Sequence, residues 1–247
     1  MKAMIFAAGL GTRLKPLTDN KPKALVEVCG TPMLGRVLLK IKEAGVKEVV
    51  VNVHHFAQMI RDYLSANNNF GLNINISDES YALLDTGGGL LAASGYLIGE
   101  EPIIVHNADI LTDFSLKEMV EAHVSSRADV TLLAQDRFSS RTFVYDDSLR
   151  LKGWTKTDTD ETVPPGLDTS DLRSLAFGGV SVVNPSLFTH LSKYSAEHGP
   201  IFSTTPFYAA NAAHLNIRGY MPGEDYCWFD IGKPENLLKA SESFFSL

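Results

Sequence analysis

The chain begins with a short apolar run that leads directly into a loop of small residues and cations. Residues 4–7 are apolar, and the loop that follows holds Gly9 and Gly11, then Thr12 and Arg13. Because glycine has no side chain, backbone N–H groups in such a loop can approach an anionic ligand closely. This opening predicts a buried strand followed by a phosphate-binding loop, and it therefore favours an α/β fold.

Two common phosphate-binding signatures do not fit this loop. The P-loop requires Gly, four residues and then Gly-Lys-Ser/Thr, and no such string follows Gly9. The dinucleotide-binding fingerprint requires Gly-x-Gly-x-x-Gly, but Leu14 stands at the position of the third glycine. A leucine there would obstruct the close packing of helix against strand that this glycine permits. Neither signature describes the chain.

The first half of the chain alternates between predicted strands and predicted helices. Apolar or alternating runs predict strands at 2–7, 46–53, 72–77, 102–106 and 130–134. Helices are expected at 31–44, 56–64, 89–97 and 116–125, the first of them beginning at Thr31-Pro32. This alternation predicts an α/β fold with a doubly wound, mostly parallel sheet in a Rossmann-like three-layer arrangement. Such sheets bind ligands at the carboxyl ends of their strands.

The second half of the chain has a different pattern. Short strands are expected at 142–144 and 149–154, and the polar stretch 155–174 is predicted to be a mobile loop. Further strands are predicted at 176–183, 214–220 and 226–229, and helices at 185–191, 205–213 and 234–245. Because no internal repeat or low-complexity segment interrupts the chain, we expect residues 1–247 to form one domain.

Composition and charge exclude several classes of partner. The net charge of −7 argues against nucleic-acid binding. Residues 1–60 carry nine Lys/Arg and four Asp/Glu, so the positive part of the chain coincides with the glycine loop. No run approaches the ~18 apolar residues of a membrane helix, and two cysteines form no disulfide or metal framework. We therefore expect a cytoplasmic protein without a membrane partner. Four cations are expected on a solvated helix face: Arg36, Lys40, Lys42 and Lys47.

The glycine loop resembles the signature of the sugar-1-phosphate nucleotidyltransferases, Gly-x-Gly-Thr-Arg-x-x-Pro-x-Thr followed by Pro-Lys. The matching residues are Gly9, Gly11, Thr12, Arg13, Pro16, Thr18, Pro22 and Lys23. The resemblance implies an enzyme that transfers a nucleoside monophosphate from a nucleoside triphosphate to a sugar 1-phosphate and releases pyrophosphate. It makes Arg13 and Lys23 candidate catalytic residues. The candidate nucleotide-binding residues of the loop are Ala8, Gly9, Gly11 and Thr12.

Two aspartates follow predicted strands at positions where the family binds metal. Asp109 comes after residues 102–106, and Asp230 lies in the string Trp-Phe-Asp-Ile-Gly. Either could cap a helix, but together they supply oxygen ligands that Mg²⁺ prefers beside phosphates and water. The family has Gly-Asp at the first position, where Ala108 replaces the glycine. We expect Asp109 and Asp230 to hold Mg²⁺, Asp109 to be catalytic, and Asn107 to contact the nucleotide.

The string Leu-Asp-Thr-Gly-Gly-Gly at 84–89 is a candidate base-binding segment. Glycine triplets also form flexible turns, but in this family a similar segment lines the nucleobase pocket. The resemblance therefore assigns base contacts to Thr86, Gly87 and Gly88, with uracil and guanine as alternatives. The string is most similar to that of N-acetylmuramate-1-phosphate uridylyltransferases. Mannose- or heptose-1-phosphate guanylyltransferases and choline-phosphate cytidylyltransferases are alternatives.

The acceptor site rests on fewer matching residues. Family members often place Glu-Lys after an aromatic residue in the strand equivalent to 149–154, and here Lys156 follows Trp154 without the glutamate. Lys156 is therefore either a sugar-phosphate ligand or a solvated loop lysine. The resemblance also assigns Gly178 and Gly179 to the sugar-phosphate site. No β-helix repeat is present.

The resemblance divides the domain into a nucleotide-binding half, about 1–135, and a sugar-phosphate-binding half, about 136–247. The expected partners are a nucleoside triphosphate and a sugar 1-phosphate, in a monomer or small homo-oligomer. A function of another class is the alternative: a non-catalytic regulatory protein that binds nucleotide sugars.

Overall fold

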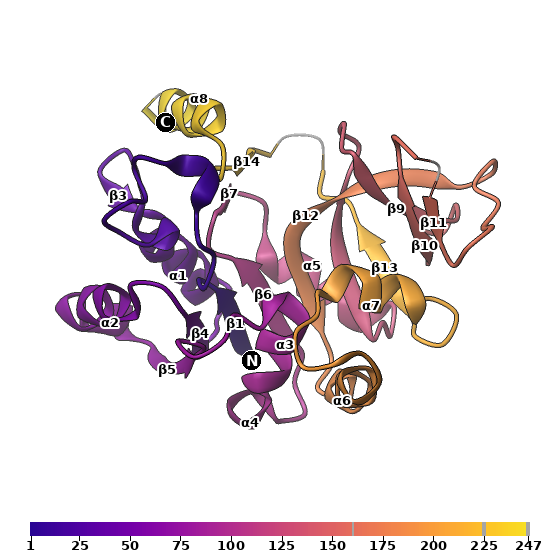
Figure 1. Cartoon of the computed structure of the whole chain (residues 1–247), viewed down its shortest axis with the longest axis horizontal. Helices are drawn as coiled ribbons and strands as arrows, with labels where there is room; N and C mark the ends of the chain where they lie inside the picture. The colour runs from indigo at the N-terminus through magenta and orange to yellow at the C-terminus, as the bar shows by residue number, and fades with distance from the viewer. Residues whose placement is uncertain (160, 224–225, 246–247) are drawn as a thin grey trace.

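A central sheet with helices on both faces organises the chain (Figure 1). The structure is a computed structural model that describes residues 1–159, 161–223 and 226–245. Within these ranges the main sheet has ten strands. Among the same residues, no helix combines the length and the apolar character that crossing a membrane requires.

The first half of the chain supplies a parallel part of the sheet. Its strands lie in the order β6-β1-β4-β5 and are β1 (Lys2–Phe6), β4 (Glu48–Val53), β5 (Asn73–Asp78) and β6 (Ile103–Asn107). Beyond β6, the long strand β12 (Arg173–Val183) runs antiparallel to both β6 and β8 (Val130–Gln135). Strand β13 (Ile217–Tyr220) is parallel to β8. Among these strands only β12 runs opposite to the others, which confirms the predicted doubly wound, mostly parallel sheet.

Three antiparallel strands extend the sheet beside the first residues of β12. They are β9 (Arg141–Tyr145), β10 (Leu151–Lys156) and β11 (Glu161–Val163). The predicted loop at 155–174 was therefore wrong in part, because it contains β11 and the start of β12. Residues 161–163 form too short and polar a run to show as a strand in the sequence. These residues form a strand because they pair with the free edge of β10.

Two apolar cores lie on opposite faces of the sheet, because successive side chains of a strand point to opposite faces. Ile5 belongs to one core with Met33, whereas its neighbour Met4 belongs to the other with Leu90. The helices that contribute to the first core are α1 (Met33–Glu43), α2 (Ala57–Ala66), α5 (Leu116–Ser125) and α8 (Pro234–Phe245), the last of which packs on β14 (Trp228–Asp230) and β2 (Glu27–Val28). Those on the second face are α3 (Asp85–Ala92), α4 (Ser94–Leu97), α6 (Leu187–His198) and α7 (Thr204–Ala210).

Several predicted boundaries were wrong for local reasons. Residues Thr31–Pro32 form the short strand β3, paired with β2 (Glu27–Val28), so α1 begins only at Met33. The helix expected at 89–97 begins at Asp85 and is divided into α3 and α4. Strand β7 (Ile110–Thr112) was not expected at all, and it pairs with β14 (Trp228–Asp230) in a separate two-stranded sheet.

Three of the helix cations expected on a solvated face are hydrogen-bonded to backbone carbonyl groups. Arg36 donates to the carbonyl oxygen of Val28, Lys40 to that of Phe114, and the exposed Lys42 to that of Phe70. Burial lowers the pKa of Lys40. These side chains therefore hold loops against α1 rather than covering a free surface.

The three glycines at 87–89 lie within α3 and allow it to pack closely on other segments. A Cβ atom at Gly87 would lie 2.4 Å from the ring of Phe202, and one at Gly88 would lie 2.2 Å from the carbonyl oxygen of Pro200. The N–H groups of Gly87 and Gly88 both donate to the carbonyl oxygen of Phe202, at 2.8 and 3.1 Å. These backbone groups are thus used within the protein.

We expect Gly88→Ala to lower the free energy of unfolding by about 1–3 kcal/mol, because the new methyl group must displace backbone at Pro200. Gly95→Ala is the matched control, since a Cβ there meets nothing within 4 Å. The control should stay within about 1 kcal/mol of the unsubstituted protein. Chemical denaturation of the two variants measures the difference, and equal stabilities would contradict this packing.

His106 is a fully buried polar side chain in β6. Its Nδ1 lies 2.8 Å from the carbonyl oxygen of Asn107, while Nε2 has no hydrogen-bond partner among the described residues. Burial lowers the pKa of His106 from 6.5 to about 4. Protonation therefore favours the unfolded chain. The stability that this group contributes is fully present above pH 6.5 and is lost as the pH falls toward 4.

Between pH 7 and pH 5 we expect the unsubstituted protein to lose about 2 kcal/mol more of its free energy of unfolding than a His106→Gln variant loses. The measurement is chemical denaturation of both proteins across this pH range. The comparison concerns how the free energy of unfolding changes with pH, so a lower overall stability of the variant does not affect it. Parallel slopes would show that His106 is not buried in its neutral form.

Candidate active site

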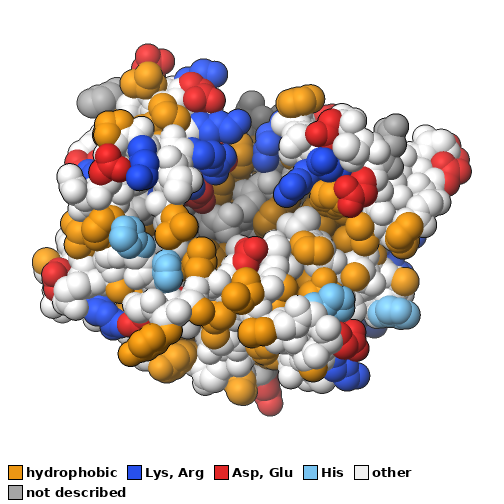
Figure 2. Space-filling model, in the orientation of Figure 1, with side chains coloured by type: hydrophobic (Ala, Val, Ile, Leu, Met, Phe, Trp, Pro, Cys, Tyr) orange, Lys and Arg blue, Asp and Glu red, His pale blue; other side chains and the backbone are white. Residues whose placement is uncertain are grey.

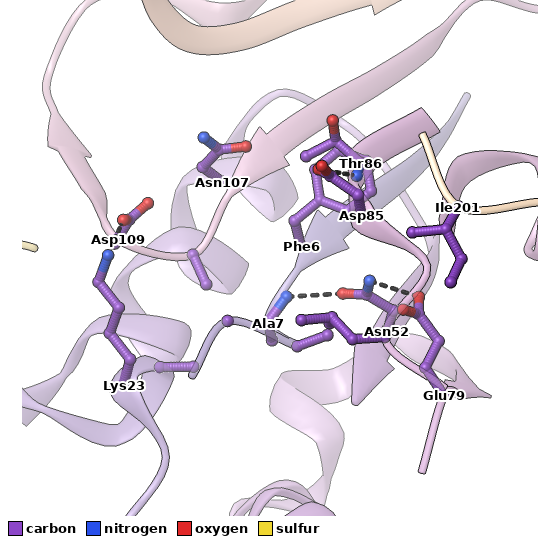
Figure 3. Close-up of a pocket in the computed structure, with 15 residues that line it drawn as sticks. Phe6, Ala7, Lys23, Asn52, Glu79, Asp85, Thr86, Asn107, Asp109 and Ile201 are labelled. Carbon is purple, nitrogen blue, oxygen red and sulfur yellow. Dashed lines mark hydrogen bonds and ion pairs between the residues drawn. The ribbon is translucent and has the colours of Figure 1, made fainter. Parts of the chain in front are cut away.

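A cavity of about 490 Å³ opens at the carboxyl ends of the parallel strands (Figure 3). Its walls come from the ends of β1, β4, β5 and β6 and from the start of α3. A doubly wound sheet places ligand sites at this edge, because the loops there diverge to the two faces. The predicted site residues that line the cavity are Ala8, Gly9, Lys23, Thr86, Asn107 and Asp109.

One end of the cavity holds a buried polar pair that the sequence did not reveal. Asn52 Oδ1 accepts from the N–H of Ala7 at 2.7 Å, and Asn52 Nδ2 donates to Glu79 Oε1 at 2.7 Å (Figure 3). The N–H of Leu84 donates to Glu79 Oε2 at 3.1 Å. Both side chains are only 3% exposed. The available signal was Asn52 itself, a polar residue inside the apolar run 49–53.

At the other end, two cations and two carboxylates converge. Lys23 forms an ion pair with Asp109 (Figure 3). A Cβ atom placed on Gly232 would lie 2.6 Å from Lys23 Nζ, 2.8 Å from Asp230 Oδ1 and 3.0 Å from Arg13 Nη2. Three of the four charged residues predicted from distant parts of the sequence therefore surround Gly232, and the fourth, Asp109, joins them through its ion pair with Lys23. Figure 2 shows Lys and Arg side chains on the rim of a hollow in the molecular surface.

Pairing of β7 with β14 brings the two aspartates together. Asp230 lies opposite Ile110, the residue after Asp109, and the N–H of Ile231 donates to the carbonyl oxygen of Asp109 at 3.0 Å. Trp228 anchors β14 to the main sheet, since its Nε1 donates to the carbonyl oxygen of Gly178 at 2.9 Å. The guanidinium of Arg137 stacks on the Trp228 ring at 4.4 Å. Burial lowers the pKa of Arg137, whereas the charge of Asp230 raises it.

The donor set at this point suits a magnesium ion that shares its coordination with a ligand. Asp230 Oδ1 accepts from the N–H of Gly232 at 2.8 Å, and Asp109 lies beside Lys23. Within the described residues, no three or more His, Cys, Asp or Glu side chains form a metal-binding group. Two carboxylates are nevertheless enough for Mg²⁺ when phosphate oxygens and waters complete its octahedron.

The predicted loop residues have different surroundings. Gly9 is exposed, and a Cβ there would meet nothing within 4 Å, so its backbone is open to a ligand. Gly11 has a φ of +65°, and its carbonyl oxygen accepts from Thr18 Oγ1 at 2.8 Å. Thr12 and Arg13 follow as exposed residues in the 3₁₀ turn Thr12–Leu14, whose last residue is buried. Gly11 therefore sets the conformation of the loop, while Gly9 leaves its backbone accessible to a ligand.

The base-binding residues predicted at 86–88 are only partly at the cavity. Thr86 lines it, and its hydroxyl accepts from the N–H of Thr204 at 2.9 Å. Gly87 and Gly88 are buried in α3 and do not line it. Asp85 was not predicted, yet it lines the cavity and has a φ of +60°, which is uncommon for a residue other than glycine. Such positions are frequent at functional sites.

A second cavity, of about 570 Å³, lies between the β9–β10–β11 strands and α7, and it shares Asp85 with the first. Lys156 lines this cavity, and its Nζ lies 3.5 Å from Asp158 Oδ1. No glutamate precedes Lys156 in the chain, but Glu161 stands beside it in register on β11 and lines the same cavity. Lys156 is thus part of a cavity wall.

Gly178 and Gly179 line neither cavity, although both lie near the site. A Cβ atom at Gly178 would lie 2.4 Å from Leu133, and one at Gly179 would lie 2.7 Å from Ile110. Gly179 also has a φ of +74°, where the register of β12 shifts. Close packing accounts for both glycines, and contact with a sugar stays a prediction.

Comparison with protein families and curated sequences agrees with this geometry. The family described as Nucleotidyl transferase matches residues 2–144. The N-acetylmuramate α-1-phosphate uridylyltransferases of Caulobacter vibrioides and Neisseria meningitidis are 33% and 30% identical to the chain. The alignments cover 96% and 97% of this chain, and 94% and 96% of the relatives. The mannose-1-phosphate guanyltransferase of Yarrowia lipolytica is 29% identical over all of this chain and 64% of its own length.

Solved structures show the same fold. A UDP-glucose pyrophosphorylase with bound UDP-glucose superposes with a TM-score of 0.78 at 19% identity, over 99% of this chain and 98% of the other. A Bacillus anthracis protein described as a glucose-1-phosphate thymidylyltransferase gives 0.81 at 16% identity, over 98% and 94% of the two chains. The chain is an enzyme of the nucleotidyltransferase family, as its resemblance to the sugar-1-phosphate nucleotidyltransferases predicted.

Proposed function

We propose that the enzyme transfers the uridylyl group of UTP to N-acetylmuramate 1-phosphate and releases pyrophosphate. The observation that carries the transferase part of this proposal is the convergence of Arg13, Lys23, Asp109 and Asp230 at the mouth of the first cavity. The choice of substrates is supported by the two uridylyltransferase relatives, whose alignments cover nearly the whole chain.

The reaction requires positioning and charge neutralisation rather than a general base. A phosphate oxygen of the acceptor, already anionic, attacks the α-phosphorus of UTP while the bond to pyrophosphate breaks in line. In this arrangement the open backbone at Gly9, together with Arg13, holds the β- and γ-phosphates and stabilises the leaving pyrophosphate. Lys23 contacts the α-phosphate and the incoming phosphate, and its pairing with Asp109 fixes the position of its ammonium group.

Asp109 and Asp230 are the proposed Mg²⁺ ligands, because β7 and β14 place their carboxylates beside the phosphate-binding cations. A bound Mg²⁺ would supply positive charge to the phosphate oxygens. The remaining groups act directly on the substrates: Asn107 lines the cavity on the side of Asp109, and Thr86 lines it beside Asp85 (Figure 3). We assign them to the nucleoside.

The buried pair Asn52–Glu79 is the proposed base-reading group. The carboxylate of Glu79 accepts hydrogen bonds, so it suits a base whose ring presents an N–H at its pairing edge. Uracil and guanine have such a group, whereas cytosine and adenine present an acceptor there. This argues against the cytidylyltransferase alternative. Guanine stays a second candidate, favoured by the mannose-1-phosphate guanyltransferase relative.

The first test replaces the converging charges. We expect Asp109→Asn and Lys23→Ala each to lower kcat for pyrophosphate release by about 10²- to 10³-fold, because each removes a positioned charge at the reacting phosphates. The control is Lys117→Ala, whose exposed side chain pairs with Glu121 on α5 and should leave kcat unchanged. Near-normal turnover in either site variant would sink the assignment. Absence of turnover in the unsubstituted enzyme with every nucleotide and acceptor would favour a regulatory protein.

The second test concerns the base. With the same acceptor, we expect the unsubstituted enzyme to use UTP at least 10²-fold better than CTP, measured as kcat/KM. Glu79→Gln offers an amide N–H₂ that can donate to cytosine, so this preference should fall by about tenfold or more. If the substitution lowers both activities equally, Glu79 supports the fold of the cavity without reading the base.

A further inference from the structure

The second cavity has a floor made of two rows of side chains that cross three neighbouring strands. In one row, Arg141, Lys156 and Glu161 are aligned in register on β9, β10 and β11. In the row two residues away, Phe143, Trp154 and Val163 are aligned in the same way. All six line the cavity, because residues separated by two positions lie on the same face of a sheet. A charged row thus borders an apolar row.

Two polar groups on this floor have no partner within the described residues. Trp154 Nε1 is buried without a hydrogen bond. The guanidinium of Arg141 takes part in no ion pair or side-chain hydrogen bond there, whereas Lys156 lies 3.5 Å from Asp158. A buried indole N–H without an acceptor costs free energy unless a ligand supplies one. Arg141 is exposed, so its guanidinium is open to a ligand that enters this cavity.

The order of the charged side chains keeps a ligand anion bound at Arg141 away from the carboxylate of Glu161. Adjacent strands lie about 4.8 Å apart, so Glu161, two strands from Arg141, lies about 10 Å from it. Lys156 stands between them. An anionic group at Arg141 is thus attracted by two cations and kept away from Glu161. The planar guanidinium also matches a carboxylate through two parallel hydrogen bonds, which the point charge of Lys156 does not.

We propose that Arg141 selects acceptors that carry a carboxylate in addition to the 1-phosphate. Trp154 supports the apolar face of the pyranose, and Lys156 attracts the phosphate. Asp85 lines both cavities, so an acceptor on this floor adjoins the nucleotide site. The inference rests on the proposed transfer to a sugar 1-phosphate. It adds the residue that recognises the carboxylate of the acceptor.

The test compares two acceptors that differ only in the lactyl ether: N-acetylmuramate 1-phosphate, which has the carboxylate, and N-acetylglucosamine 1-phosphate, which lacks it. The readout is kcat/KM for pyrophosphate release at saturating UTP. We expect Arg141→Gln to lower the ratio of the first value to the second by about 10- to 100-fold. Lys156→Gln should lower both values by similar factors. Arg173→Gln, on neighbouring β12 and outside the cavity, is the matched control and should change neither value.

An unchanged ratio in Arg141→Gln overturns the proposal. Equal losses with both acceptors would instead mean that Arg141 holds the phosphate, and no loss would mean that it does not touch the acceptor. Calorimetric titration of each acceptor gives the same comparison without turnover. An enzyme that binds the carboxylate-bearing acceptor through Arg141 but releases no pyrophosphate would contradict the proposed reaction alone.

Discussion

The pairing of β7 with β14 is the contact on which the candidate active site depends. It joins a three-residue strand after Asp109 to one that ends at Asp230, more than a hundred residues later. Trp228 fixes β14 to the main sheet through Gly178, and Gly232 leaves room for the side chains of Lys23, Arg13 and Asp230. Without this small sheet, the cations of the first loop would face a single carboxylate.

The two halves of the chain contribute different chemistry because their strands are arranged differently. The parallel strands end together, so their loops gather polar groups at one edge and enclose the first cavity. The antiparallel strands β9–β11 instead present one face, where alternating residues form charged and apolar rows. The proposed phosphate-binding edge and the proposed acceptor floor thus meet at Asp85 and share one continuous sheet.

Local patterns predicted what depends on neighbours in the sequence. The helices at 116–125 and 234–245 were predicted with their observed bounds, since Ser115 caps the first and Pro234 begins the second. Gly87 and Gly88 were predicted to contact the base, but in the fold they pack against Phe202 and Pro200. Asn52 and Glu79 were not predicted, because a buried hydrogen bond between residues of neighbouring strands produces no recognisable residue spacing in the sequence.

The sequence by itself determined the family, the fold class and the charged residues of the candidate site, because these rest on a dense motif and on periodic apolar runs. Only the tertiary structure decided that Lys23 pairs with Asp109, that Asp230 lies beside them, and that Arg141 and Trp154 line a second cavity. The physical reason is that these neighbours are set by strand pairing across long separations, and pairing partners are chosen by packing of the whole sheet rather than by any local pattern.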